Sequence, residues 1–146
     1  MKKLLMIDDT ADFTRFVDHV ARSQGFEVRV ATSAESFRRI YEETVPDVIM
    51  LGVVMPEVDG FELTAWLCER GATARLLLVS DHNPVYAKWL SQLAEINGDM
   101  TVSILRKPMP EATLVAALKG GTGFSPHKTR LDGTNGDLNP PSCGDA

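Results

Sequence analysis

Five short apolar runs alternate with helical patterns along this chain, and this alternation is the feature that most limits its fold. The runs lie at residues 4–7, 26–31, 48–51, 76–79 and 102–105. The run at 4–7 is continuous, as is typical of a strand buried on both faces, whereas Glu27 and Arg29 interrupt the second run as at a sheet edge. Strands that alternate with helices predict an α/β fold, with an open parallel sheet covered on both faces.

Apolar residues at helical spacing fill the intervals between these runs. We predict helices through residues 13–21, 35–44, 63–67, 86–94 and 110–119. Thr32, followed three residues later by Glu35, matches a capping box that would open the second helix. Trp89 shares the periodicity of the fourth helix, which predicts a core position for it rather than an exposed one.

The composition changes at Gly120. Residues 1–119 are predicted to form one domain, whereas residues 120–146 are rich in Gly, Pro, Asn, Asp and Thr and have no apolar periodicity. Such a segment cannot bury enough apolar surface to offset the entropy of ordering it. We therefore predict a flexible C-terminal tail.

The charge balance narrows the class of partner. The net charge is -5, which disfavours nucleic acid and anionic membranes as partners. No run approaches the length of a membrane span, and the N-terminal run is too short for a signal peptide. Cys68 and Cys143 form neither a disulfide framework nor a metal-ligand spacing. We expect a cytoplasmic protein.

Polar groups follow the predicted strands where the carboxyl ends of a parallel sheet gather. These groups are Asp8 and Asp9 after the first strand, Ser80 after the fourth and Lys107 after the fifth. Two carboxylates suit Mg²⁺, a lysine neutralises phosphate charge and a hydroxyl donates to a phosphoryl oxygen. Each group alone has a simpler explanation, such as a helix cap or an ordinary loop. Together they predict a site that handles a phosphoryl group.

The chain resembles the receiver domains of bacterial two-component response regulators over residues 1 to 119. The resemblance is carried by IDD at 7–9, PDVIML at 46–51, MPEVDG at 55–60, Ser80, and Lys107 with Pro108. It implies a flavodoxin-like (βα)5 fold, a doubly wound sheet of five parallel strands in the order 2-1-3-4-5. It also implies signalling by phosphorelay.

The resemblance assigns roles to individual residues. Asp8, Asp9 and the backbone carbonyl of Val54 would hold Mg²⁺. Ser80 and Lys107 would contact the phosphoryl group. An aspartate at the end of the third strand would accept that group from a histidine kinase.

At that position this sequence has Gly52, which carries no nucleophile. Asp47 lies at the other end of the strand, roughly 16 Å away, and Asp59 lies beyond the loop, so neither should replace it. Ile104 stands where the family usually has an aromatic switch residue. We expect weak Mg²⁺ binding, Lys107 paired with Asp8 or Asp9, and water in the space beside Gly52.

Three hypotheses of function follow. The first is a receiver-type domain that acts through protein–protein contacts without an aspartyl-phosphate at position 52. The resemblance implies a histidine kinase or a downstream signalling protein as partner. It also implies an output face built from the fourth helix, the fifth strand and the fifth helix, which can also form homodimers. Trp89, Leu90 and Leu105 lie near this face.

The alternative is a phosphorylatable, Mg²⁺-dependent receiver whose natural aspartate has been replaced by Gly52. Such a parent would catalyse only its own phosphotransfer and dephosphorylation. The third hypothesis, an enzyme or small-molecule binder on the same fold, has only Cys68 and His82 as conspicuous candidates. No base–nucleophile pair is evident, so we expect no enzyme.

Overall fold

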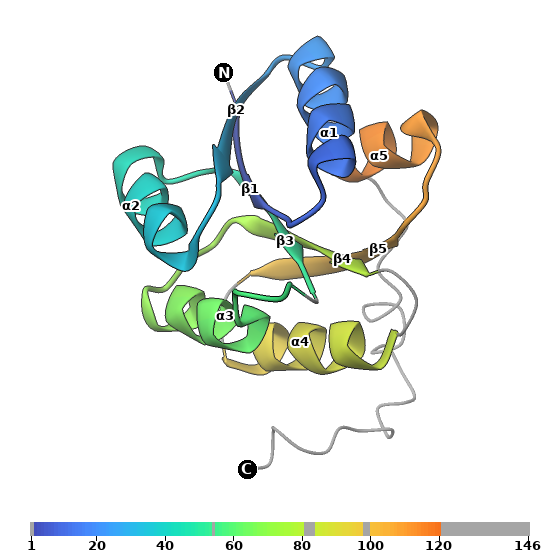
Figure 1. The fold of residues 1–146 in the computed structure, drawn as a ribbon. Helices are drawn as coiled ribbons and strands as arrows, with labels where there is room; N and C mark the ends of the chain where they lie inside the picture. Colours follow the sequence, from blue (N-terminus) through green and yellow to red (C-terminus); the bar gives the residue numbers. More distant parts are fainter. Residues whose placement is uncertain (1, 54, 81–83, 98–99, 121–146) are drawn as a thin grey trace.

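The computed structural model describes residues 2–53, 55–80, 84–97 and 100–120. Its centre is a sheet of five parallel strands in the order β2-β1-β3-β4-β5 (Figure 1). The strands are β1 (Lys2–Ile7), β2 (Phe26–Ala31), β3 (Val48–Gly52), β4 (Arg75–Ser80) and β5 (Thr101–Arg106). The predicted fold class and strand order are confirmed.

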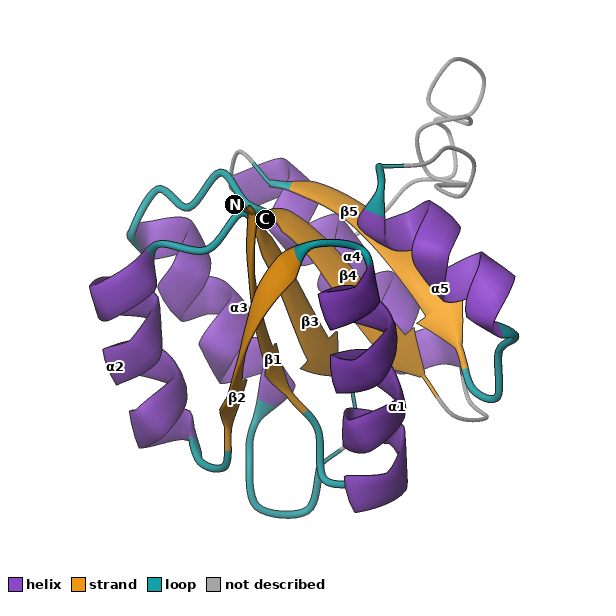
Figure 2. Ribbon diagram, turned by 90° about the horizontal axis from the view of Figure 1, so that it is seen from above, coloured by secondary structure: helices purple, strands orange, loops and turns teal. Residues whose placement is uncertain are grey.

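Five helices cover the two faces of this sheet. They are α1 (Ala11–Ser23), α2 (Ala34–Thr44), α3 (Gly60–Glu69), α4 (Pro84–Asn97) and α5 (Glu111–Leu118). Helices α1 and α5 lie on one face, and α2, α3 and α4 lie on the other (Figures 1 and 2). Because every connection is a helical crossover, all the strands point the same way and their carboxyl ends meet at one edge.

Two hydrophobic clusters, one on each face, hold the layers together. Successive residues of a strand alternate between them, since side chains along a strand point to opposite faces. In β1, Leu4 belongs to the cluster under α1 and α5, whereas Leu5 belongs to the cluster under α2, α3 and α4. Both side chains are fully buried. Burial on both sides explains why this strand reads as an unbroken apolar run.

The second helix begins differently from the sequence prediction. Its N-cap is Ser33, whose Oγ accepts a hydrogen bond of 3.0 Å from the Ser36 backbone N–H. The Ser36 hydroxyl in turn accepts one of 3.1 Å from the Ser33 N–H. The predicted box of Thr32 and Glu35 is therefore wrong by one residue, because serine at Ser36 performs the role that a glutamate usually has.

The position predicted for Trp89 is also wrong. Its residue surface is 54% exposed, whereas the adjacent Leu90 and Ser91 are fully buried. Leu93 packs partly against the cluster under α2, α3 and α4. The apolar stripe of α4 is thus narrower than the sequence periodicity suggests, and the indole lies outside it.

Of the predicted tail, residues 120–146, all but Gly120 lies outside the described residues. Among the residues that are described, none of the helices combines the length and the apolar character needed to cross a membrane.

Candidate functional site

The carboxyl edge of the sheet brings the predicted site residues together. Gly52 ends β3 and is level with Val79 of β4, and Ser80 at the end of β4 is level with Arg106 of β5. Ile7, the last residue of β1, is level with Leu51. The side chains that follow these strands therefore converge, as the order of elements predicted.

Asp8 occupies the most enclosed position of the site. Its side chain is 2% exposed, and its Oδ1 accepts a hydrogen bond of 2.9 Å from the Thr10 backbone N–H. The same oxygen lies 3.2 Å from Lys107 Nζ in an ion pair. Asp9, by contrast, is exposed, and its Oδ1 accepts a hydrogen bond of 3.4 Å from the Thr10 hydroxyl. Of the two predicted partners for the lysine, the structure thus selects Asp8.

Lys107 has further contacts that sequence reasoning missed. Its Nζ donates a hydrogen bond of 3.3 Å to Thr10 Oγ1 and lies 4.7 Å from the centroid of the Phe13 ring. Thr10 is the N-cap of α1, yet its side chain makes no capping hydrogen bond, because its hydroxyl is engaged at the site instead. Thr10 looks in the sequence like an ordinary cap and Phe13 like an ordinary apolar residue of an amphipathic helix, so neither indicated a contact with a cation.

The backbone also fixes the lysine. The Lys107 N–H donates a hydrogen bond of 2.9 Å to the carbonyl oxygen of Ser80, which ties the loop after β5 to the end of β4. Ser80 itself is 4% exposed. The two residues predicted to contact a phosphoryl group are therefore neighbours at this edge.

No open space adjoins the α-carbon of Gly52. A β-carbon built there would lie 3.0 Å from Asp8 Oδ2, 3.3 Å from Met55 Cγ and 3.4 Å from Met55 Sδ. Met55 is buried, so an apolar thioether forms much of the wall that we expected to be polar. The β-carbon position itself is therefore bordered closely by Asp8 and Met55, and water in the space beyond it stays a prediction.

The other aspartates near this strand are engaged elsewhere. Asp47 Oδ2 accepts a hydrogen bond of 2.8 Å from the Lys3 N–H at the amino end of β1. Asp59 is the N-cap of α3, and its Oδ1 accepts bonds of 2.9 Å from the Phe61 N–H and 3.3 Å from the Glu62 N–H. Neither carboxylate is held in a position to replace the missing one.

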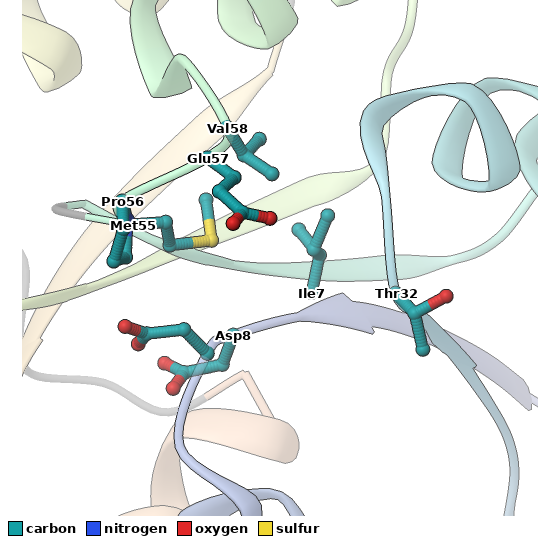
Figure 3. Close-up of a pocket in the computed structure, with 8 residues that line it drawn as sticks. Ile7, Asp8, Thr32, Met55, Pro56, Glu57 and Val58 are labelled. Atoms are coloured by element: carbon teal, nitrogen blue, oxygen red, sulfur yellow. The ribbon is translucent and has the colours of Figure 1, made fainter.

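A pocket of about 300 Å³ opens beside the ion pair. Its lining residues are Ile7, Asp8, Asp9, Thr32, Met55, Pro56, Glu57 and Val58. Figure 3 shows the Met55 thioether and the Glu57 carboxylate projecting from the loop after β3 toward Ile7 and Asp8. The pocket thus combines acidic groups with an apolar wall.

Asp8 and Asp9 are the two carboxylates at the predicted Mg²⁺ position. Within residues 2–53, 55–80, 84–97 and 100–120, no group of three His, Cys, Asp or Glu side chains is placed to hold a metal ion. The buried carboxylate, Asp8, is already neutralised by Lys107. Val54, the predicted carbonyl ligand, lies outside the described residues, as does His82.

Two remaining candidates lie apart from this chemistry. Ile104, at the predicted switch position, is partly buried and packs against the cluster under α2, α3 and α4. Cys68 is partly buried on α3 and packs against the same cluster.

These observations define a class: a flavodoxin-like (βα)5 domain with acidic side chains and a lysine at the carboxyl edge of its sheet. A model of the response regulator receiver domain matches residues 4–119. The chain therefore belongs to the response regulator receiver domain family, as the sequence motifs indicated.

Known proteins show the same relationship. The chain is 30% identical over 82 residues to the chemotaxis protein CheY of Listeria monocytogenes, an alignment that covers 55% of this chain and 68% of that protein. It is 26% identical over 128 residues to the transcriptional regulatory protein TrcR of Mycobacterium tuberculosis, covering 88% of this chain and 48% of TrcR. Among solved structures, the chemotaxis protein CheY4 of Vibrio cholerae superposes with a TM-score of 0.71 at 24% identity, covering 82% of this chain and 98% of CheY4.

Proposed function

We propose that this receiver domain transmits its signal through protein–protein contacts without an aspartyl-phosphate at position 52. Receiver domains as a family act in two-component signalling, where they interact with histidine kinases and effector proteins. The observation that carries the proposal is Gly52 at the end of β3, where it provides no carboxylate to accept a phosphoryl group.

The surrounding contacts support the same proposal. Lys107, which would otherwise neutralise a phosphoryl group, is paired with Asp8. Asp47 and Asp59 bind backbone N–H groups elsewhere. A phosphorylatable site would need a carboxylate within reach of Lys107 and Ser80, and neither of these aspartates is placed there. The chain is in this proposal a cytoplasmic signalling module and not an enzyme.

A surface on α4 supports a role in binding proteins. Val85 is 44% exposed and Trp89 is 54% exposed, and the two residues lie one helical turn apart. Exposed tryptophan is enriched among the residues that dominate protein interfaces. This surface belongs to the predicted output face, although Leu90 and Leu105 near it are buried. A histidine kinase, an effector or a second copy of the chain is the proposed partner, and the net charge of -5 disfavours nucleic acid.

The second candidate is a phosphorylatable receiver whose natural aspartate has been replaced by Gly52. It is favoured by the retention of Asp8, Ser80 and Lys107 at one edge of the sheet. In the parent protein, the carboxylate at position 52 would accept the phosphoryl group. A β-carbon at that position would lie 3.0 Å from Asp8 Oδ2 and 3.3 Å from Met55 Cγ, so these two side chains would have to shift by a few tenths of an ångström.

Intact-protein mass after incubation with Mg²⁺ and acetyl phosphate separates these candidates. The unaltered chain, Gly52→Asp and Gly52→Asn are compared in one series, with Gly52→Asn as the control for size without a nucleophile. We expect the unaltered chain and Gly52→Asn to keep their masses. A phosphoryl group on the unaltered chain would overturn the proposal, because another residue would then be the acceptor.

The Gly52→Asp variant tests whether the site lacks only its nucleophile. A gain of one phosphoryl group by this variant alone would show that the site lacks only its nucleophile, which favours the replaced-aspartate candidate. Failure of Gly52→Asp to gain the group, in a variant that keeps its fold by circular dichroism, would show that more than the nucleophile is missing. That result would favour a domain that signals without phosphate.

A further inference from the structure

The ion pair at the carboxyl edge is a consequence of burial as well as of charge. The Asp8 side chain is 2% exposed and the Lys107 side chain is 18% exposed. An ionised carboxylate in such a position requires a counter-ion, because removing an unpaired charge from water is strongly unfavourable. Lys107 Nζ, 3.2 Å from Asp8 Oδ1, provides this counter-ion from within the chain.

Three described contacts of the ammonium group come from one short segment of the chain. Besides Asp8, Lys107 Nζ contacts Thr10 Oγ1 at 3.3 Å and the Phe13 ring at 4.7 Å from its centroid. The Thr10 N–H also donates to Asp8 Oδ1 at 2.9 Å, which orients the carboxylate toward the lysine. A carboxylate, a hydroxyl and an aromatic face are all favourable neighbours of an ammonium ion. The segment from Asp8 to Phe13 thus forms a cation-binding site that Lys107 of the same chain occupies.

The strand order explains why Asp8 receives this lysine. Strands β3 and β4 lie between β1, which precedes Asp8, and β5, which precedes Lys107. The Lys107 N–H is fixed to the Ser80 carbonyl at the end of β4, and its side chain extends from there to the end of β1. Gly52, at the intervening end of β3, offers no carboxylate that would compete for the ammonium group.

A divalent cation at this edge would have to compete with the lysine. Mg²⁺ needs only one or two protein carboxylates, and Asp8 is the buried one. Two cations within a few ångströms of each other repel strongly where little water screens them. Mg²⁺ could therefore bind Asp8 only after the ammonium group had left it.

We infer that Lys107 is the permanent counter-ion of Asp8 in this chain and that it excludes divalent cations from this carboxylate. The inference deepens the proposed function, because a domain without a phosphoacceptor has no step that requires the metal. The fold of this domain is then stable without Mg²⁺, because Lys107 already neutralises the buried Asp8 carboxylate.

Cation binding and thermal unfolding test this inference in four proteins: the unaltered chain, Lys107→Met, Lys107→Arg and the control Lys119→Met. Lys119 is exposed at the end of α5 and belongs to the opposite edge. Mn²⁺ serves as a paramagnetic substitute for Mg²⁺, so that binding is measured directly by its resonance signal. We expect Lys107→Met to bind Mn²⁺ at least about tenfold more tightly than the unaltered chain.

The unfolding temperature provides the second readout. Millimolar Mg²⁺, against EDTA at matched ionic strength, should raise the midpoint of Lys107→Met and leave the midpoints of the other three proteins unchanged. Lys107→Arg keeps the charge and should behave as the unaltered chain. Equal Mn²⁺ affinity in the unaltered chain and in Lys107→Met would overturn the inference.

A further variant keeps the test decisive if Lys107→Met does not fold. If Lys107 excludes cations from Asp8, then Asp8→Asn must leave the Mn²⁺ affinity of the chain unchanged. A loss of affinity in Asp8→Asn would show that Asp8 holds the cation, which contradicts the inference. These readouts do not depend on phosphorylation, so a failure here is distinguishable from a mass gain that would overturn the proposed function.

Discussion

The two edges of the sheet each hold a partly buried cation, and the two cations have different partners. At the amino edge, Arg75 at the start of β4 donates hydrogen bonds to the carbonyl oxygens of Ala117 and Leu118, at the end of α5. At the carboxyl edge, Lys107 pairs with the Asp8 carboxylate. Arg75 thus binds neutral backbone groups, whereas Lys107 neutralises a full charge.

The two cations differ in how well stability alone accounts for their contacts. The last carbonyls of a helix lack intrahelical donors and carry partial negative charge. A guanidinium can therefore donate hydrogen bonds to them without a full negative charge having to be buried beside it. Burial lowers the pKa of Arg75 from its usual value, yet an arginine stays charged at neutral pH. A buried carboxylate with a lysine costs desolvation of two ions and adds little net stability over an apolar pair. Stability alone therefore explains Arg75 well and the Asp8–Lys107 pair poorly.

The largest stability effect in this comparison is expected for Arg75→Met. The substitution removes the guanidinium donor of the Leu118 carbonyl in a partly buried position, while the Ala117 carbonyl keeps the Gly120 N–H at 3.2 Å. We expect a loss of about 2–3 kcal/mol in the free energy of unfolding, measured by urea denaturation. The loss should be the same in EDTA and in Mg²⁺, in contrast to the behaviour expected of Lys107→Met.

Arg15→Met is the matched control for this prediction. Arg15 pairs with Asp12 on the surface of α1, where both side chains are more than 70% exposed. Such a pair should contribute no more than about 1 kcal/mol. Equal losses of unfolding free energy in Arg75→Met and Arg15→Met would show that the Arg75 hydrogen bonds stabilise the fold no more than an exposed ion pair does. Arg75 would then not be a structural contact of the amino edge.

A smaller effect is expected at the carboxyl edge for Gly60→Ala. A β-carbon at Gly60 would lie 3.3 Å from the Val53 carbonyl oxygen and 3.6 Å from Leu90 Cδ1. Backbone cannot move aside as a flexible side chain can, so the crowding should outweigh the better helix propensity of alanine. We expect a net loss of about 1 kcal/mol, measured by thermal unfolding.

Glu62→Ala, in the same turn of α3, serves as the control for Gly60→Ala. Glu62 lies 3.7 Å from Arg38, and its own side chain is 64% exposed, so its removal should cost less than about 0.5 kcal/mol. A stabilised Gly60→Ala variant would mean that the backbone at Val53 moves away from the new β-carbon at little cost. The carboxyl edge would then be softer than the contacts around Gly52 suggest.

The sequence predicted the strands and their order better than it predicted the side chains at the site. Buried parallel strands are easy to recognise in a sequence, because residues on both of their faces must be apolar. Both ends of β2 were predicted correctly. The sequence limited the partner of Lys107 to Asp8 or Asp9. It could not choose between them, because the choice depends on which carboxylate is buried beside the lysine. Thr10 and Phe13 were missed because their contacts with the lysine join segments about a hundred residues apart.

Trp89 and the capping box show the limits of local patterns. Helical spacing alone cannot tell how wide a stripe a neighbouring sheet will cover, and α4 buries Leu90 while leaving the indole largely exposed. In the same way, Thr32 and Ser33 are both good N-caps, and only the backbone geometry selects Ser33. These features depend on tertiary packing, which a window of a few residues does not contain.

The smallest effect concerns the contacts between α2 and α3, where Tyr41 packs edge-on against Trp66 at 5.4 Å between ring centroids. Burial raises the pKa of the Tyr41 hydroxyl, Glu42 raises it further and Arg70 opposes the change. A raised pKa in the folded state means that the neutral phenol contributes stability below its ordinary pKa near 10, and that this contribution is lost as the pH rises through the folded value.

Tyr41→Phe should therefore flatten the alkaline fall in stability. We expect the free energy of unfolding of the unaltered chain to fall more steeply above pH 10 than that of the variant. The difference should be less than about 1 kcal/mol because the ring is partly exposed. Tyr86→Phe controls for the loss of the only other tyrosine in the chain. Parallel curves for the unaltered chain and Tyr41→Phe would contradict the prediction, because they would show that the phenol ionises equally well in the folded and the unfolded chain. The α2–α3 contact would then add no pH dependence to the stability of the domain above pH 10.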